Sequence, residues 1–344
     1  MDLNLQSGSG TENYDSVIVM PQAIDADVAA EREGILEALA LGRKLSKKTF
    51  VVSTSAKFKR LLETTPGLGG ATVLDAHDVA GWSKVFGVDA APRDDIFRYA
   101  PRWESIKHDY PGPFIGSGSS LPLMTSRGCA SACLYCNDKD AHRGVADDDV
   151  LTAVRSAMSL GVTRFVIEDQ QFNESDNVSR FCALLQKNDL RIRWQCLSGI
   201  YPSLSRPEVE LMKKTGCEHV ALGMEHCDPA VLRSEGRLCD PERASRTIGL
   251  LKEHGIKVSG YYLLGLGSSS FFNDLRMILN ASLSECDFIH FSVLNGKPSN
   301  RLLKILGYAV VYLSPRRSMA VLKTLLASPS KIEKIRAKSR RIFS

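Results

Sequence analysis

The sequence predicts an α/β protein in three parts: a small N-terminal parallel α/β domain, a partial (β/α)6 barrel and a helical, basic C-terminal extension. Two observations predict this class. Apolar stretches of strand length alternate with amphipathic stretches of helix length, and a segment rich in proline, glycine and serine at 111–120 interrupts that alternation. The 344 residues also suit two domains of about 150 residues each.

A polar tail at 1–14 and an N-terminal domain at 15–115 form the first part. Strands and helices alternate in this domain, which is typical of a parallel sheet. The glycines at 67–70 precede a strand and open no helix, so no phosphate-binding turn is predicted there. The predicted strands are 16–20, 49–53 and 71–74, and the predicted helices are 26–47 and 57–63.

The second part, 116–300, contains six further β/α units, which favour a parallel sheet curved into an open barrel. In such folds the chemistry takes place at the carboxyl ends of the strands. The extension at 301–344 is predicted to be helical, and its basic end is typical of a solvated face. The barrel strands are expected at 121–126, 163–169, 192–197, 219–225, 258–264 and 288–294, and the helices at 147–160, 175–188, 207–215, 241–254 and 272–284.

The composition excludes several classes of protein. Hydrophobic residues make up 44% of the chain and charged residues 24%, which is ordinary for a globular protein and not for a disordered one. No apolar run approaches the roughly 20 residues that span a bilayer. Residues 1–16 lack the basic and apolar regions of an export signal, so we expect a cytoplasmic protein. The net charge of +5 gives only weak support for nucleic-acid binding.

The nine cysteines are the most unusual feature of the sequence, and their odd number argues against a disulfide framework. Cys129, Cys133 and Cys136 follow the first barrel strand with C-x3-C-x2-C spacing. Thiolates suit iron–sulfur clusters and zinc. A [4Fe–4S] cluster normally takes four thiolates, so three would leave one iron open to a small molecule. The alternative is a zinc site closed by His142 or by a distant cysteine.

With Tyr135 before its last cysteine, the motif resembles the signature of the radical S-adenosylmethionine (SAM) enzymes, and the resemblance covers about residues 120–300. It implies that the open iron chelates the amino and carboxylate groups of SAM. It also implies that an external one-electron reductant, such as flavodoxin or ferredoxin, drives cleavage of SAM. The resulting 5′-deoxyadenosyl radical would abstract hydrogen from a substrate.

Further segments resemble the subgroup whose relatives often carry a cobalamin domain. Two departures from the subgroup's pattern stand out: G-L-G-S-S-S at 265–270 lacks the usual acidic residue, and His226-Cys227 replaces the usual S-G. The cofactor contacts implied by the resemblance are Tyr135 beside the cluster, Asp169 near the methionine amine, Glu225 at the ribose and Gly265 beside the adenine.

The N-terminal domain does not match the cobalamin-binding pattern D-x-H-x-x-G. The segment Asp75-Ala76-His77-Asp78 comes close, but no glycine follows at the required position. The sequence therefore predicts a degenerate domain of that kind and argues against cobalamin. The three additional N-terminal cysteines of the tRNA methylthiotransferases are absent, and no β-rich RNA-binding module follows, so a nucleic-acid substrate is disfavoured.

Six cysteines lie outside the motif, and free cysteine is usually a core residue. Cys182, Cys217 and Cys286 are predicted to be core residues. Cys196, Cys227 and Cys239 are expected near the catalytic end of the barrel. Because strand residues alternate faces, Cys227 should share the face of Glu225.

These last three cysteines leave three interpretations open: ligands of an auxiliary iron–sulfur cluster, a hydrogen-atom donor to a substrate radical, or passive residues. The auxiliary cluster would be the sulfur source for a C–S bond-forming enzyme of natural-product or antibiotic biosynthesis. In size and cysteine placement the chain resembles radical enzymes that exchange sulfur for the ring oxygen of a nucleoside. In this interpretation Cys227 and Cys239 belong to the catalytic apparatus as well as to the metal site.

We therefore expect a small-molecule substrate and no membrane partner. For a nucleotide substrate, Lys257, Tyr261, His290 and Ser292 are candidate phosphate contacts. Two other functions stay open: a radical epimerase or mutase that uses a cysteine hydrogen donor without a second cluster, and a non-catalytic metal-binding or redox-sensing module.

Overall fold

The computed structural model describes residues 17–19, 49–53, 72–75, 120–136, 141–238, 241–294, 298–313 and 317–318. The chain divides into two compact units, Met1–Ile96 and Phe97–Ser344.

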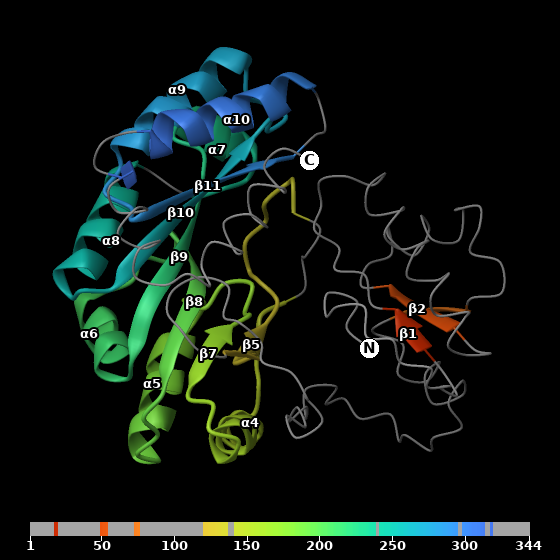
Figure 1. Cartoon of the computed structure of the whole chain (residues 1–344), viewed down its shortest axis with the longest axis vertical. Helices are drawn as coiled ribbons and strands as arrows, with labels where there is room; N and C mark the ends of the chain where they lie inside the picture. The colour runs from red at the N-terminus through yellow and green to blue at the C-terminus, as the bar shows by residue number, and fades with distance from the viewer. Residues whose placement is uncertain are drawn as a thin grey trace. The chain divides into compact units, whose positions relative to one another are not determined.

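The N-terminal unit contains a three-stranded parallel sheet in the order β1-β2-β3 (Figure 1). Its strands are β1 (Val17–Val19), β2 (Thr49–Ser53) and β3 (Thr72–Asp75). The predicted parallel sheet of this unit is thereby confirmed. The helices predicted at 26–47 and 57–63, and most of the Asp75–Asp78 segment, lie outside the described residues.

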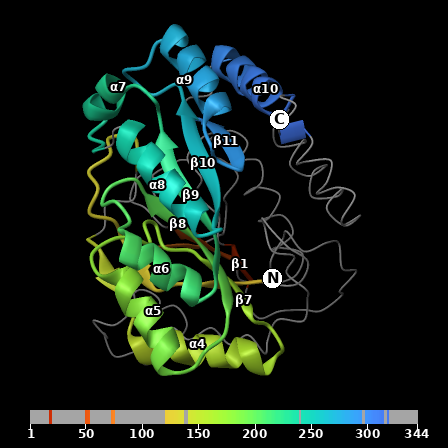
Figure 2. The same cartoon turned by 90° about the vertical axis from the view of Figure 1, so that its left-hand side faces the viewer.

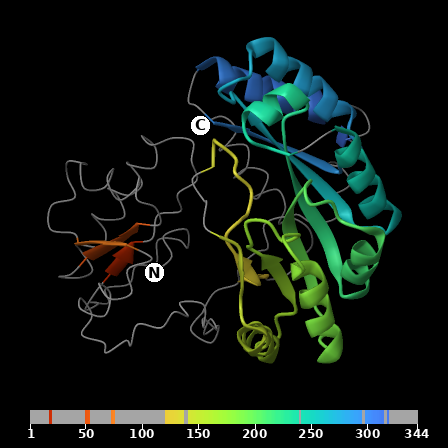
Figure 3. The same ribbon diagram turned by 180° about the vertical axis from the view of Figure 1, so that it is seen from behind.

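The second unit is built on a six-stranded sheet in the order β11-β10-β9-β8-β7-β4, with every pairing parallel. Within this sheet each strand lies beside the strand that precedes it in the order β4, β7, β8, β9, β10 and β11, so the colour runs steadily from yellow-green to blue across the strands (Figures 1 and 3). The sequence prediction of a mostly parallel α/β sheet is confirmed. Its strands are β4 (Leu121–Leu123), β7 (Arg164–Ile167), β8 (Arg193–Gly199), β9 (Cys217–Glu225), β10 (Lys257–Leu264) and β11 (Phe288–Val293).

Helices follow the strands and form a layer along one face of this sheet (Figure 2). Aromatic packing joins the layers: the Trp194 ring of β8 lies 5.2 Å from Phe172 and 5.4 Å from Phe181, between ring centroids. The helices are α4 (Asp147–Ser159), α5 (Asn177–Lys187), α6 (Arg206–Lys214), α7 (Pro229–Ser234), α8 (Pro241–Glu253), α9 (Phe271–Leu283) and α10 (Pro298–Tyr312).

Helix α10, the described start of the predicted helical extension, runs along the β11 edge of the sheet. The Tyr308 hydroxyl accepts a hydrogen bond from the Phe291 amide at 3.2 Å. The Tyr312 hydroxyl accepts from the Ile289 amide at 3.1 Å and donates to the Ile289 carbonyl at 3.0 Å. These bonds satisfy backbone groups that an edge strand otherwise presents for pairing with another chain.

A short antiparallel pair, β5 (Ser126–Arg127) with β6 (Arg143–Gly144), was not predicted by the sequence patterns. Arg180 of α5 holds it in place, because its guanidinium donates to the carbonyls of Thr125 at 2.6 Å and Val145 at 2.8 Å. Among the described helices, none is both long and apolar enough to cross a bilayer.

Candidate cluster and cofactor site

The loop with the three motif cysteines begins directly after β5, at the carboxyl end of the sheet. Gly128 starts it with a φ of 77°, and its amide donates to Gln170 Oε1 at 3.0 Å. Two N–H groups point at its sulfurs: the Ser131 amide lies 3.4 Å from Cys129 Sγ, and an Arg237 N–H lies 3.5 Å from Cys133 Sγ. Hydrogen bonds of this kind are typical of the thiolates that hold iron–sulfur clusters.

No group of three or more histidine, cysteine or acidic side chains converges on a single metal position within the described residues, which include His142. The motif cysteines do not need to converge for a cubane, because each thiolate binds a different iron. Three thiols on one short loop, with N–H donors directed at two of them, therefore fit a [4Fe–4S] cluster.

The turn Glu235–Arg237 at the end of α7 packs directly against the cysteine loop. The Glu235 carbonyl accepts a hydrogen bond from the Leu134 amide at 2.9 Å. Gly236 has a φ of 72°, and a Cβ added there would lie 2.7 Å from the Ala132 carbonyl oxygen. Only glycine permits both this conformation and this close approach.

Arg237 connects three parts of the site. Its guanidinium donates to Cys133 Sγ at 3.5 Å and to the Gly223 carbonyl at 2.9 Å, and it lies 3.5 Å from Glu225 Oε1. The side chain is 13% exposed, so these interactions are weakly screened by solvent. The Arg237 guanidinium therefore links the cysteine loop, strand β9 and the predicted ribose contact Glu225.

Glu225 sits at the end of β9 in a left-handed conformation, with a φ of 59°. Its carboxylate folds back over Gly223, where an added Cβ would lie 2.7 Å from Glu225 Oε1. Burial raises the pKa of Glu225, while Arg237 opposes that shift. A strained, non-glycine residue that holds a charge at a strand end is typical of a functional position.

Tyr135, the aromatic residue before the last motif cysteine, lies near Glu225 and Arg237. Its buried hydroxyl makes no hydrogen bond of ordinary geometry. Burial raises its pKa strongly, and the neighbouring Glu225 charge adds to the shift. The structure thus brings Tyr135, Glu225 and the cysteine loop together, as the resemblance implies for a cofactor site.

Asp169 has a different environment from the one expected for a ligand contact. Its carboxylate is buried and accepts from the Thr125 amide at 2.8 Å, the Thr125 hydroxyl at 2.5 Å and the Ser126 hydroxyl at 2.8 Å. Asn177 of α5 donates to it at 3.1 Å. The structure gives Asp169 the task of fixing the strand that leads into the cysteine loop, and contact with the methionine amine stays a prediction.

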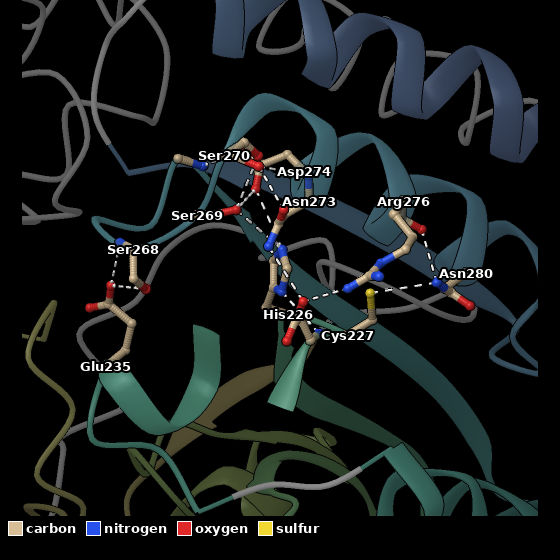
Figure 4. Close-up of polar contacts among 12 residues, drawn as sticks. His226, Cys227, Glu235, Ser268, Ser269, Ser270, Asn273, Asp274, Arg276 and Asn280 are labelled. Carbon is tan, nitrogen blue, oxygen red and sulfur yellow. Dashed lines mark hydrogen bonds and ion pairs between the residues drawn. The ribbon is translucent and has the colours of Figure 1, made fainter. Parts of the chain in front are cut away.

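Gly265 ends β10 with a φ of 80°, and its amide donates to Asp274 Oδ2 at 2.9 Å. The loop that follows lacks the acidic residue of the usual motif, but carboxylates from elsewhere reach it. Glu235 Oε1 accepts from the Ser268 amide at 3.1 Å and from its hydroxyl at 3.0 Å (Figure 4). The predicted adenine loop is therefore hydrogen-bonded to the turn that carries Arg237.

The expectation that Cys227 shares the face of Glu225 is wrong. The pairing of β9 with β10 shifts register between Tyr261 and Tyr262, and the left-handed Glu225 turns the chain. The alternation of side chains between the two faces of the strand is broken as a result. Cys227 packs toward α9, where Asn280 Nδ2 lies 3.6 Å from its sulfur (Figure 4). Its roles as metal ligand and hydrogen donor remain predictions.

The other predicted auxiliary ligands are not brought to Cys227 by the described structure. Cys196 is buried on the helix-covered side of the sheet, where it interacts with Cys217 and with Cys182 of α5. Cys239 lies outside the described residues. Cys182, Cys217 and Cys286 are all buried, as expected for core residues.

The four candidate phosphate contacts divide into two groups. Tyr261 stacks on His290 with ring centroids 4.5 Å apart, and it pairs in register with His290 of β11 on one side and with Gly223 of β9 on the other. Lys257 starts β10 four residues earlier, about 13 Å away at the rise of a strand. Ser292 is exposed two residues beyond His290 on the same strand.

Arg237 and Glu235 were missed by the sequence analysis. A weak signal was present: the segment E-G-R follows a short helix that begins with Asp228-Pro229, and it stands two residues before Cys239. Charged residues on both sides of a helix-ending glycine are common on surfaces, so only the structure shows that these two turn inward.

Part of the chain resembles known proteins. Residues 123–270 match the family described as the radical SAM superfamily. The chain is 22% identical over 186 residues to an uncharacterised methyltransferase of Pyrococcus horikoshii, covering 52% of this chain and 40% of that protein. It is 26% identical over 158 residues to the bacteriochlorophyllide d C-12(1)-methyltransferase of Chlorobaculum tepidum, covering 44% and 34%. The matched region thus spans less than half of either relative.

Among solved structures, the fold resembles the radical SAM methyltransferase TsrM of Kitasatospora setae, determined with cobalamin and a [4Fe–4S] cluster. The TM-score is 0.57 at 15% identity, covering 82% of this chain and 64% of TsrM. The cysteine motif, the six-stranded parallel sheet and the family match agree with one another. Residues 123–270 are thereby identified as a radical SAM domain, as the motif resemblance implies.

Proposed function

We propose that the chain binds a [4Fe–4S] cluster through Cys129, Cys133 and Cys136, binds SAM at the open iron, and abstracts hydrogen from a small-molecule substrate. When bound, the cluster and SAM supply the 5′-deoxyadenosyl radical once an external reductant donates one electron. The observation that carries the proposal is the position of Arg237 between Cys133 Sγ, the Gly223 carbonyl and Glu225.

The chain's own residues have separable tasks in this proposal. Arg237 donates to a cluster thiolate and offsets the Glu225 charge, so it holds the cysteine loop against the end of β9. Asp169 fixes the approach to the loop through its four hydrogen bonds. Glu225 presents a carboxylate oxygen suited to accept hydrogen bonds from ribose hydroxyls.

The type of reaction is a finer hypothesis. Sulfur insertion, for instance into the sugar of a nucleotide in antibiotic biosynthesis, depends on an auxiliary cluster held by Cys196, Cys227 and Cys239. Cys196 and Cys227 contact different elements, so hydrogen abstraction without a second cluster is better supported. Methyl transfer, named for the two curated relatives, is a further candidate.

Cobalamin is a separate question, because TsrM binds it and the N-terminal unit here has a parallel sheet. The absence of the D-x-H-x-x-G pattern favours a chain that works without cobalamin. Titration of the anaerobically reconstituted chain with hydroxocobalamin, followed by gel filtration, tests this. Co-elution of one cobalamin per chain would overturn it and favour methyl transfer.

The proposed function is tested on the reconstituted chain by electron paramagnetic resonance of the dithionite-reduced cluster, with and without SAM, and by 5′-deoxyadenosine release. We expect SAM to change the spectrum of the wild type. Arg237→Gln should weaken SAM binding by about tenfold or more, since hydrogen bonds to charged groups are worth about 1.5–3 kcal/mol.

Arg193→Gln is the matched control, because Arg193 pairs with Glu218 at the amino end of β8, the opposite end of the sheet. It should bind SAM like the wild type. If SAM did not change the paramagnetic resonance spectrum of the wild-type cluster, the proposal would be contradicted and a redox-sensing module would be favoured.

A further inference from the structure

The two departures from the subgroup's sequence pattern lie in contact with each other. His226 stands where the pattern has serine, and Ser269 stands where it has the acidic residue. In the structure His226 Nε2 lies 3.4 Å from Ser269 Oγ (Figure 4). Two substitutions 43 residues apart in sequence therefore form one interaction.

The orientation of the His226 ring follows from its other nitrogen. The Asp228 amide donates to His226 Nδ1 at 3.0 Å, so Nδ1 is the acceptor nitrogen of the ring. The ring proton is consequently on Nε2, which faces Ser269 and Asp274. His226 is buried, so this donor has no access to bulk water.

The Asp274 carboxylate, at the base of the loop, lies against both Ser269 and His226. Its Oδ1 accepts from Ser269 Oγ at 2.5 Å and lies 3.5 Å from His226 Nε2, while its Oδ2 accepts from the Gly265 amide at 2.9 Å. Asp274 is 2% exposed. A buried carboxylate is stable only when donors surround it, so removal of one donor loosens the others.

From these contacts we propose that His226 is a positioning residue for SAM. It holds the loop 265–270 to the end of β9 through Ser269 and Asp274, and so sets the distance between the Gly265 backbone and Glu225. The inference rests on the proposed function, in which these two segments bind the same cofactor. In this chain a histidine–serine–aspartate arrangement does the task that a serine and an in-loop acid would share in the subgroup's pattern.

Two conservative variants separate the two nitrogens of His226. The amide of Gln reaches the Nε2 position and can still donate to Ser269 and Asp274. The side chain of Asn reaches only the Nδ1 position, where it can accept from the Asp228 amide and cannot reach the loop. We expect His226→Gln to bind SAM within about threefold of the wild type, and His226→Asn to weaken SAM binding about tenfold, the equivalent of one lost hydrogen bond to a charged group.

The measurement is SAM titration of the reconstituted, reduced chain, read from the cluster's paramagnetic resonance. Iron content and thermal unfolding are recorded for each variant as controls. Ser269→Ala should match His226→Asn, and the double variant should be no worse than either, because both remove the same connection.

Equal SAM affinity for His226→Asn and the wild type would overturn the inference, as would equal losses in His226→Asn and His226→Gln. Loss of iron in His226→Asn would also overturn it, because the role would then concern cluster assembly. A wild type that does not respond to SAM would overturn the proposed function instead, so the two failures are distinguishable.

Discussion

The carboxyl edge of the six-stranded sheet and its helix-covered face surround cysteine in opposite ways. At the edge, Cys129 and Cys133 receive N–H donors from Ser131 and Arg237. On the covered face, Cys196 and Cys217 lie buried beside each other among apolar side chains.

Burial favours the neutral form of two thiols on the covered face, Cys182 and Cys217. Burial raises the pKa of Cys182 to about 11, with Thr215 opposing the shift, and it also raises the pKa of Cys217. The thiolate is the form that binds metals and reacts, so such residues are inert. The comparison teaches that position on the sheet, more than the number of cysteines, separates the proposed cluster ligands from the core cysteines in this chain.

The largest expected effect is a matched pair of cysteine substitutions. Cys133→Ala should abolish SAM cleavage, because the chain then loses a thiolate of the cluster. Cys217→Ala should keep about four irons per chain and full cleavage. Iron analysis and 5′-deoxyadenosine release after anaerobic reconstitution measure both.

Cys217→Ala should cost stability instead, by about 1 kcal/mol in urea unfolding, because it leaves a small cavity in the core. If Cys217→Ala lost iron while Cys133→Ala kept it, the assignment of the two groups would be reversed.

Much of this arrangement was predictable from the sequence. The period of apolar residues predicted every strand of the large sheet, and the C-x3-C-x2-C spacing predicted the loop at its edge. Both signals are local: the first reflects which side chains are buried, and the second reflects cluster geometry.

What could not be predicted depends on irregular backbone in β9. Pairing with β8 shifts register between Trp194 and Gln195, so Cys217 and His219 point to opposite sides although they are two residues apart. The second shift, beside Glu225, sends Cys227 to the helix side. A bulge reverses every face assignment that follows it, and the residue pattern does not show where it occurs.

On the face of the sheet opposite the helix layer, His219 is expected to make the stability of the fold depend on pH. Its Nε2 lies 2.8 Å from Ser259 Oγ and its Nδ1 lies 3.3 Å from Gln195 Oε1. Burial lowers the pKa of His219 from 6.5 to about 4, although Asp287 opposes the shift. The folded chain therefore leaves this ring neutral at pH values where the unfolded chain protonates it.

This difference in protonation sets the direction in which stability changes with pH. As pH falls from about 6.5 to about 4, the unfolded state gains a proton that the folded state lacks, so the free energy of unfolding should fall by about 3 kcal/mol. His219→Gln should flatten this dependence, measured by urea unfolding of the cluster-free chain across that range. A slope unchanged by the substitution would show that other groups cause it.

The smallest expected effect bears on the hypothesis of a second cluster. Cys196 is 4% exposed, and its sulfur lies 3.7 Å from the Ser198 hydroxyl on the same strand. As a core residue, Cys196→Ala should lower stability by about 1 kcal/mol and leave the iron content of the wild type, about four per chain, unchanged. Mössbauer spectroscopy of the reconstituted chain distinguishes this result from a wild type with about eight irons that falls to about four in the variant.

The second result would mean that β8 rearranges to bring Cys196 to the carboxyl edge, and it would make sulfur insertion the better-supported reaction. The first result would exclude Cys196 as an iron ligand, as expected for a buried thiol beside Cys217 that cannot reach the edge without breaking the packing around Trp194.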